Sequence, residues 1–573
     1  MRQKIAFVLL LFVTSSAFQS RVFTQPSRYA HHLTIQSNPS PEDFLEKRLT
    51  PSAGSSSTSN AATIAATLVQ QNKQFLDWLS TEGNLHLQPI STWFEAPHPV
   101  AISLDTRNVD TNESSGRGIV ARVDIPSGGE ILRVPMKVCI TKSTAVSTFG
   151  PGVIPPSMNE YIALALILIR EKFALPPGTS YFSAYVDVLP PTVESVSPTF
   201  TWGEQALETL KGSPLLPATI SLQNKLKAEY ESFVLPLVES KPDVFSEDVY
   251  NMENWLWAFT MLFSRAVRLT DNLSQDGGAR EKIAMVPYAD LINHSPFSRS
   301  FIASRLTPGK IMWEKTDPGL DEEVIIYADR PVRKMEQIYV NYGEKSSSDF
   351  MLFYGFGGGE SNPFNSVDVT IGILPPKEGG DEQTLALFDK KIAFLKQMDA
   401  PLVADFPVYS DRYPTEMLEY CRLMLLTTEE CEKKENLDEF DFTKPVGRDN
   451  EARVLMSVIR ACKAQLDKYP STEEQDAAII GDKGMFGLLG MQERMGIRQR
   501  RSEKRLLKRT VAALEREGAA RGLFDPDADD ESVGVLYDEY YNQNSVVSVD
   551  GKTRRKSSLE KRLSDMGLPV DLR

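Results

Sequence analysis

Histidine and cysteine are both scarce in this chain of 573 residues, which contains five histidines and four cysteines. His294 is the only histidine beyond residue 98. The cysteines are widely spaced, with no C-x-x-C pair: Cys139, Cys421, Cys431 and Cys462. A structural zinc site needs clustered Cys or His ligands, and a disulfide scaffold needs closely placed cysteines. The sequence therefore argues against both kinds of site.

The chain also lacks an excess of basic residues. Its 63 Lys and Arg residues are outnumbered by 77 Asp and Glu, which gives a formal net charge of −14. Binding to the phosphate backbone of nucleic acids depends mainly on positive charge. We therefore do not expect a nucleic-acid partner. The composition, 41% hydrophobic and 24% charged, is that of an ordinary soluble globular protein with several domains.

The N-terminus contains one short apolar run, Ile5–Val13, which is too short to span a membrane. It follows a basic start and precedes Ser15–Ala17, small residues typical of a signal-peptide cleavage site. No acidic residue occurs before Glu42. We predict a signal peptide over residues 1–17 and a transit-like segment over 18–41, an arrangement that resembles a bipartite plastid presequence. Secretion is the alternative. We expect no membrane segment in the mature form.

The decapeptide from Val286 to Ser295 sets Asp290, Asn293 and His294 in an apolar run. Polar groups in an apolar setting must find hydrogen-bond partners, so the decapeptide predicts a compact, buried polar cluster. On its own it favours a structural role, because Asp and Asn are common in turns and helix caps and a lone His usually has a structural partner.

Hydrophobic periodicity predicts the order of elements. Residues 42–72 are of low complexity and predict a linker. Alternating residues from Gly116 to Pro135 predict a β-hairpin, whose two entrance glycines allow close approach of a ligand. Helices are expected over 159–171 and 246–268, and strands over 324–328 and 337–343. Five further segments show helical spacing or strong helix formers: Leu385–Met398, Glu416–Leu426, Asn450–Lys468, Thr472–Ile480 and Arg494–Arg509.

Tyr342 and Tyr354 follow the decapeptide in sequence. Tyrosine is rigid and polar at its tip, so two of them can wall an apolar channel and still offer hydroxyls. Taken alone, both are equally compatible with interior strand positions.

Taken in order, these motifs resemble those of SET-domain protein methyltransferases of the plastid Rubisco large-subunit methyltransferase group. The similar segments are Gly116–Ala121, Glu160–Leu166, Trp257–Ala266, Asp290–Ser295, Tyr342–Phe356, Tyr469–Glu474 and Glu503–Arg505. The resemblance implies an α+β protein with a β-rich SET fold, an inserted helical subdomain and an all-α C-terminal domain. The implied divisions are a SET domain over 73–365 with its insert at 145–275, a helical substrate-binding domain over 366–520, and a charged, partly flexible tail over 521–573.

The resemblance also implies a reaction, the transfer of a methyl group from S-adenosylmethionine to the ε-amine of a lysine in a protein. The implied cofactor-binding residues are Ser115, Gly116, Arg117, Asn293 and His294. The implied catalytic residue is Tyr342, and the implied substrate-binding residues are Arg265, Asp290 and Tyr354. The protein substrate would bind through the C-terminal helices, with the Rubisco large subunit and fructose-bisphosphate aldolase as examples. The oligomeric state is left open.

The chemistry fits these residue types. An amine of ordinary pKa, about 10.4, must lose a proton before it can attack the methyl group, and burial in an aromatic channel favours the neutral amine. The channel also fixes the direction of attack. Two alternatives stay open: a SET enzyme acting on another protein or on histidine, and a non-catalytic SET-fold interaction protein.

The chain departs from the family pattern at four positions. Ser347 stands where Asn is usual, Asn365 where Asp is usual, and Leu269 where some members have a second arginine near the substrate. Arg117 is a bulky residue between two glycines. These departures bear on the substrate more than on the cofactor.

Overall fold

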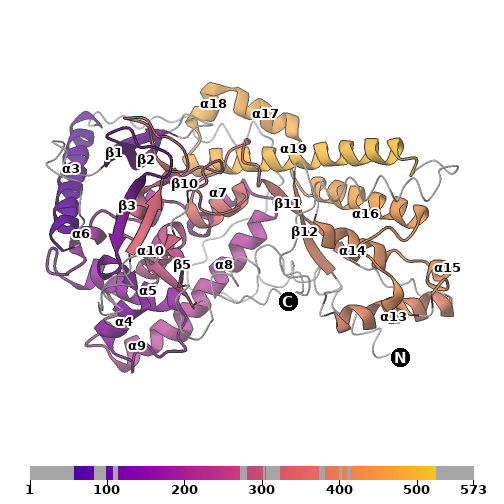
Figure 1. Ribbon diagram of the computed structural model, residues 1–573, viewed down its shortest axis with the longest axis horizontal. Coiled ribbons are helices and arrows are strands. Elements are labelled where there is room, and N and C mark those ends of the chain that lie inside the picture. Colours follow the sequence, from indigo (N-terminus) through magenta and orange to yellow (C-terminus); the bar gives the residue numbers. More distant parts are fainter. Residues whose placement is uncertain are drawn as a thin grey trace, which may run out of the picture. The chain divides into compact units, whose positions relative to one another are not determined.

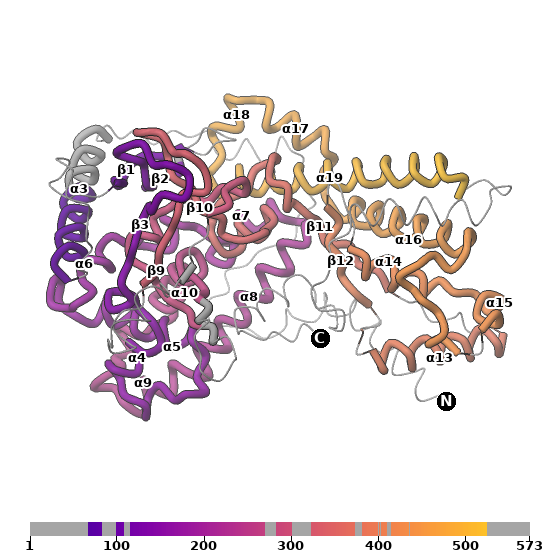
Figure 2. The backbone as a smooth tube through the Cα atoms, viewed as in Figure 1, coloured from indigo at the N-terminus to yellow at the C-terminus, as the bar shows by residue number. Residues whose placement is uncertain are grey.

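The computed structural model describes residues 57–82, 99–107, 114–271, 280–300, 303–304, 323–372, 381–398, 400, 403–409, 414–434 and 436–523. The expected signal peptide and transit-like segment, and almost all of the expected tail, lie outside the described residues. The chain divides into two compact units, Met1–Thr63 and Ile64–Arg573. All side chains discussed below belong to the second unit. Figure 1 labels its helices and strands, and Figure 2 follows its backbone in the same view.

Short strands form the β-rich part of the fold. They are β1 (Val100–Arg107), β2 (Ser114–Ala121), β3 (Glu130–Pro135), β4 (Ile140–Thr141), β5 (Val267–Asp271), β6 (Arg280–Met285), β7 (Asn293–His294), β8 (Ala303–Ser304), β9 (Glu323–Tyr327) and β10 (Tyr339–Val340). β1 pairs with β2, β9 lies between β3 and β8, and β6 lies between β4 and β5. β7 and β10 pair in parallel. The decapeptide follows β6 directly and contains β7, so it connects two of these small sheets.

The prediction of a β-hairpin between Gly116 and Pro135 is wrong, because the two strands do not pair with each other. β2 pairs with the preceding strand β1, and β3 pairs with β9, almost two hundred residues further along the chain. The residues between β2 and β3 also leave the local sheet, because Ile125 forms a bridge with Val332. Alternation of residues identifies a strand but does not identify its partner, so the local pattern could not reveal either pairing.

Helices inserted between β4 and β5 pack around α5 and α10. The inserted helices are α4 (Lys142–Phe149), α5 (Glu160–Ile169), α6 (Ser183–Val186), α7 (Glu204–Glu208), α8 (Leu215–Glu229), α9 (Leu235–Ser240) and α10 (Met252–Arg265). α5 is buried and apolar on almost every side, as a central core helix must be. The indole groups of Trp255 and Trp257 donate to the carbonyls of Leu226 and Pro190. These bonds fix α10, which ends at Arg265.

The C-terminal region is mainly helical. Its elements are β11 (Ser366–Gly372), α13 (Glu382–Gln397), β12 (Val403–Tyr409), α14 (Thr415–Met424), α15 (Thr428–Cys431), α16 (Arg448–Leu466), α17 (Glu473–Gly481), α18 (Lys483–Leu488) and α19 (Met491–Ala520). The expected helices are thus present. The expectation of an all-α domain missed one antiparallel pair, β11 with β12. Val367, Val369 and Ile371 alternate toward the core, a period of two that outweighs the helical composition around them.

Buried side chains form two hydrophobic clusters, and α19 contributes to both. Met495 packs against the first cluster, which belongs to the N-terminal strands and the inserted helices. Leu507 and Leu514 lie in the second cluster, which belongs to the C-terminal region. The second cluster also encloses a buried ion pair, in which Arg422 Nε lies 2.5 Å from a carboxylate oxygen of Glu451. α19 therefore joins the two parts of this unit.

The linker expected over residues 42–72 is helical from Ser57 onward, because α3 runs from Ser57 to Thr81. Alanine is frequent in its first half and is the strongest helix former. Phe75 and Leu79 on its second half are buried in the first cluster. Among the described helices, none combines the length and the apolar character needed to cross a membrane.

Candidate functional site

The segment between β6 and β7 carries the polar residues of the decapeptide. It forms a short 3-10 helix, Ala289–Leu291, directly before β7. Tyr288, which precedes this helix, has a left-handed backbone with a φ of 74°. Such a conformation costs a non-glycine residue about 1–3 kcal/mol and persists where the surroundings enforce it. The ring of Tyr288 is buried, and its hydroxyl donates to the carbonyl of Val100 at 3.3 Å. Packing against β1 therefore holds this turn in place.

The buried Asp290 forms an ion pair with the partly buried Arg265 at the end of α10. Arg265 Nη1 lies 3.0 Å from the carbonyl oxygen of Asp290 and 3.4 Å from its carboxylate, and the Tyr185 hydroxyl donates to the same carboxylate at 3.0 Å. Burial raises the pKa of Asp290, and Arg265 opposes that shift. Among the described residues, Asp290 Oδ1 and Arg265 Nε are buried without a partner. One is an acceptor and the other a donor, so the pair can bind a polar ligand group.

Asn293 ties β7 to the glycine-bearing strand β2. Its Nδ2 donates to Thr106 Oγ1 at 2.9 Å and to the carbonyl of Arg117 at 3.4 Å. Thr106 Oγ1 in turn donates to the carbonyl of Gly116 at 3.0 Å. Gly118 has no room for a side chain, because an added Cβ would lie 2.6 Å from Asn293 Nδ2. Glycine at this position allows the two strands to approach closely, and Gly116 supplies a left-handed φ of 70°.

The side chain of Arg117 turns away from its two glycine neighbours into the protein. Its guanidinium donates to the carbonyl of Val188 in the insert and, at 3.4 Å, to Asn72 Oδ1 in α3. Burial, together with the nearby charge of Arg265, lowers the pKa of Arg117 to about 10. The bulk of this residue is thus accommodated in the interior, while its carbonyl stays with Asn293. Ser115, the neighbouring candidate, is exposed.

His294 lies among aromatic rings. The backbone N–H of Tyr342 donates to His294 Nδ1 at 3.1 Å. The ring centres of His294 and Phe350 are 4.5 Å apart, and Tyr342 stacks on Tyr354 with a separation of 5.2 Å. The Tyr342 hydroxyl donates to the carbonyl of Ile292 at 2.6 Å. Burial lowers the pKa of His294 to about 4, so the imidazole is neutral at physiological pH.

Burial raises the pKa of both Tyr342 and Tyr354 well above the ordinary value for tyrosine. Their hydroxyls are therefore protonated at neutral pH and can donate hydrogen bonds. A third tyrosine, Tyr161 of α5, is also buried, and burial raises its pKa to about 12. The result is an aromatic group whose polar tips are neutral.

Tyr354 is carried by a turn that the chain fixes at both ends. The turn consists of α12 (Ser347–Asp349) and the π-helical segment Phe350–Tyr354. The Ser346 hydroxyl accepts from the N–H of Asp349, which caps the start of the turn. After the turn, Gly355 has a left-handed φ of 74°, and an added Cβ would lie 1.9 Å from the carbonyl oxygen of Val196.

Two departures from the family pattern lie in contact beside this turn. The hydroxyl and the N–H of Ser347 donate to Asn365 Oδ1, at 2.7 and 3.0 Å. Asn365 Nδ2 donates to the carbonyl of Gly359 at 2.7 Å. A small hydroxyl opposite an amide therefore makes a complete local network, so the two unusual residues compensate for one another.

The structure brings most of the predicted site residues together through the decapeptide, with Arg265 at Asp290, Arg117 at Asn293, and Tyr342 and Tyr354 at His294. Sequence reasoning missed Thr106 as a partner of Asn293 and did not link Tyr185 to Asp290. Neither residue lies in a local motif that announces the contact. No cluster of three or more potential metal ligands (His, Cys, Asp or Glu) occurs within the part of the chain that the structure describes.

Two family models match the chain: the SET domain over residues 116–343 and the Rubisco LSMT substrate-binding domain over residues 382–507. A chain with this fold and this site is a SET-domain protein. More narrowly, the chain combines a SET domain with a Rubisco LSMT substrate-binding domain. The combination of domains expected from the sequence motifs is thereby confirmed.

Curated relatives match over most of the chain. A chloroplastic [fructose-bisphosphate aldolase]-lysine N-methyltransferase of Arabidopsis thaliana is 29% identical over 408 residues, which cover 68% of this chain and 76% of that protein. A chloroplastic ribulose-1,5 bisphosphate carboxylase/oxygenase large subunit N-methyltransferase of Nicotiana tabacum is 27% identical over 403 residues, covering 69% and 74%. An actin-histidine N-methyltransferase of Homo sapiens is 24% identical over 425 residues, covering 71% and 65%.

Solved structures share the fold. The SET domain of LSMT bound to lysine and AdoHcy superimposes with a TM-score of 0.61 at 24% sequence identity, covering 82% of this chain and 96% of that chain. The α+β class, with a SET fold followed by a mainly helical C-terminal region, is confirmed.

Proposed function

We propose that this protein is an S-adenosylmethionine-dependent protein-lysine N-methyltransferase that acts on a plastid protein. The observation that carries the proposal is the convergence of two elements on one segment. Asn293 contacts β2, the strand that carries Gly116 and Gly118. The next residue, His294, contacts Tyr342, which stacks on Tyr354. A cofactor entrance and an aromatic channel would thus share a single rigid backbone.

The residues fit the cofactor. Gly116 leaves the backbone of β2 open, because an added Cβ at this position would meet nothing within 4 Å, and the neighbouring Gly118 lets Asn293 approach the strand closely. Ser115, Gly116 and Arg117 would contribute backbone groups. Asn293 and His294 would hold the polar parts of the ligand. When bound, S-adenosylmethionine supplies a methyl group on a positively charged sulfur.

The protein's own residues would prepare the lysine. An amine in the aromatic channel loses hydration, which lowers its pKa and favours the neutral, nucleophilic form. Because the hydroxyls of Tyr342 and Tyr354 remain protonated, neither serves as a base at neutral pH. Tyr342 would instead orient the amine, beside the carbonyl of Ile292 to which it already donates. Arg265 and Asp290 would form the polar rim of the channel. Most of the rate would come from alignment, and no metal is required.

The first experiment is to incubate the mature protein with radiolabelled S-adenosylmethionine and a plastid extract, followed by mass spectrometry of each labelled band. We expect a labelled protein that carries methyl groups on lysine, and Tyr342→Phe should abolish most of the label. Absence of both labelling and calorimetric binding of S-adenosylmethionine would reject the proposal.

A second candidate is methylation of histidine. It is favoured by the match to actin-histidine N-methyltransferases, which covers 71% of this chain. The same mass spectra separate the two candidates, because they locate the methyl group on lysine or on imidazole.

We also propose that the chain enters a plastid through the signal peptide (1–17) and the transit-like segment (18–41). The support is the acid-free N-terminus and the chloroplastic relatives. The substrate would bind to the C-terminal region, where the Rubisco LSMT substrate-binding model matches. A fluorescent fusion of residues 1–41 should enter plastids, and secretion of that fusion would contradict the targeting proposal.

A further inference from the structure

Helix α19 contacts the SET part of the protein along its first four turns. Gln492 Nε2 donates to Ser197 Oγ at 2.7 Å. Gly496 lies so close to the insert that an added Cβ would be 1.9 Å from Thr209 Oγ1. One turn later, Gln499 Nε2 donates to Ser348 Oγ at 2.9 Å. This face of α19 is therefore fitted to the insert and to the turn that carries Tyr354.

Glu503 lies at the centre of this seam. Its side chain is buried, with only 3% of the residue exposed. One carboxylate oxygen accepts from Ser213 Oγ at 2.8 Å, from Gln499 Nε2 at 2.9 Å and from Ser348 Oγ at 3.3 Å. The other accepts from the Tyr469 hydroxyl at 2.9 Å. These donors come from the insert, from the α12 turn and from the C-terminal region itself.

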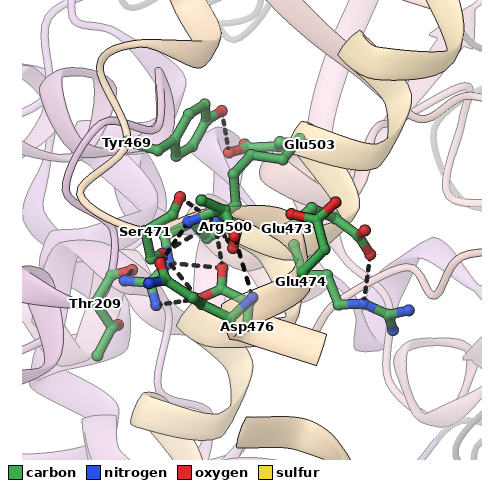
Figure 3. A network of polar contacts seen from close by, with 12 residues as sticks. Thr209, Tyr469, Ser471, Glu473, Glu474, Asp476, Arg500 and Glu503 are labelled. Atoms are coloured by element: carbon green, nitrogen blue, oxygen red, sulfur yellow. Dashed lines mark hydrogen bonds and ion pairs between the residues drawn. The ribbon is translucent and has the colours of Figure 1, made fainter. Parts of the chain in front are cut away.

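All four donors are neutral, although cations lie nearby on the same helix. Arg500 and Lys504 are engaged by Asp476, with their nitrogens 2.6 Å from its carboxylate oxygens. Figure 3 shows the two arrangements next to each other, with Tyr469 on Glu503 and Arg500 on Asp476. Burial raises the pKa of Glu503, and the hydrogen bonds from its four donors oppose that shift. Burial of a carboxylate without an ion pair costs folding free energy. Stability therefore does not explain a glutamate at this position, which suggests a second role.

Ser348 links this carboxylate to the candidate site. It belongs to α12, which continues without a break into the segment Phe350–Tyr354. Phe350 contacts the ring of His294, and Tyr354 stacks on Tyr342. A shift of Ser348 would therefore be passed along less than two helical turns to the channel wall.

We propose that Glu503 is a positioning residue: from the substrate-binding region, its carboxylate holds Ser348 and so fixes the α12 turn that places Tyr354 in the lysine channel. The inference deepens the function proposed above and rests on it. The substrate-binding region would then contribute to the geometry of the channel as well as to binding.

Three variants and a matched control test this role. Glu503→Ala removes the acceptor of all four donors, and Ser348→Ala removes the hydroxyl through which the turn bonds to Glu503 and Gln499. Glu503→Gln keeps an oxygen that can accept from the three donors at one end, and the Tyr469 hydroxyl can accept from the new amide at the other. Tyr469→Phe is the control, because it breaks a hydrogen bond to the same carboxylate without involving the turn.

We expect Glu503→Ala and Ser348→Ala to lower kcat by about 10- to 100-fold, since a displacement of about 1 Å can cost about 100-fold. KM for S-adenosylmethionine should stay within about twofold, because the cofactor residues are not touched. Glu503→Gln should restore kcat, and Tyr469→Phe should keep it. Hydrogen exchange should rise over residues 346–356 in Glu503→Ala and Ser348→Ala only.

Unchanged kcat and exchange in Ser348→Ala would overturn the inference. So would equal effects of Tyr469→Phe and Ser348→Ala, or failure of Glu503→Gln to restore kcat, since each indicates a role in general stability or charge. Exchange is measured without substrate. If the wild-type protein transferred no methyl group, the proposed function would fail, while the exchange data would still decide whether Glu503 fixes the turn.

Discussion

Replacement of Gly118 by alanine should weaken cofactor binding while leaving the fold in place. An added Cβ would lie 2.6 Å from Asn293 Nδ2 and 2.7 Å from Thr106 Cγ2. Ordinary contact begins at 3.4 Å, so the amide of Asn293 must move by about 0.8 Å (3.4 − 2.6). Both contacts are to side chains, so the side chains rather than the two strands are expected to shift. Because Asn293 is proposed to hold the cofactor, its displacement should weaken the complex more than it disturbs the fold.

Overpacking of this kind costs about 1–3 kcal/mol. If the strain is felt in the complex, it corresponds to a rise in Kd of about 5- to 150-fold. Calorimetry with S-adenosylmethionine measures this directly. Gly152→Ala is the matched control, because an added Cβ at Gly152 meets nothing within 4 Å. If Gly118→Ala bound S-adenosylmethionine with wild-type affinity, the assignment of β2 to the cofactor site would be refuted.

Three further predictions concern the channel, the imidazole and the C-terminal core. Tyr342→Phe keeps the stacked ring but loses the hydroxyl, so kcat should fall by about 100-fold with little change in cofactor affinity, as steady-state kinetics and calorimetry would show. The low pKa of His294, about 4, means that between roughly pH 6.5 and 4 the unfolded chain binds a proton that the folded chain does not. The free energy of unfolding should therefore fall as pH drops through that window, and His294→Gln should flatten this slope in urea titrations. Arg422→Ala leaves Glu451 buried without its cation and should destabilise the protein by about 3–5 kcal/mol, whereas equal unfolding midpoints would contradict the buried pair.

Local pattern was sufficient for the helices and for the residues within the decapeptide. α5 and α10 follow from helical spacing. The structure adds that the side chains of Asn159 and Asn251 cap their N-termini. The cluster around Asp290 and Asn293 follows from the rule that buried polar groups need partners. The family resemblance then supplied the order of the parts and the function.

Partners far along the chain could not be predicted in this way. Tyr185 lies 105 residues from Asp290, and Thr106 lies 187 residues from Asn293. The pairing of β3 with β9 and the contact of Ser348 with Glu503 likewise join residues that are far apart in the sequence. In each case the sequence specifies a group that needs a partner, and only the tertiary fold decides which group supplies it.

The shared helix α19 limits how these proteins can be recombined. One face of α19 contacts the SET part through Gln492, Gly496, Gln499 and Glu503. The residues that it contacts lie roughly 150 to 300 positions earlier in the chain. A chimera that exchanged only the C-terminal region, with the aim of redirecting the enzyme to a new target, would place a foreign helix against Thr209 and Ser348. Successful exchange therefore requires that this face of α19 be inherited together with the SET part, even though it lies at the other end of the chain.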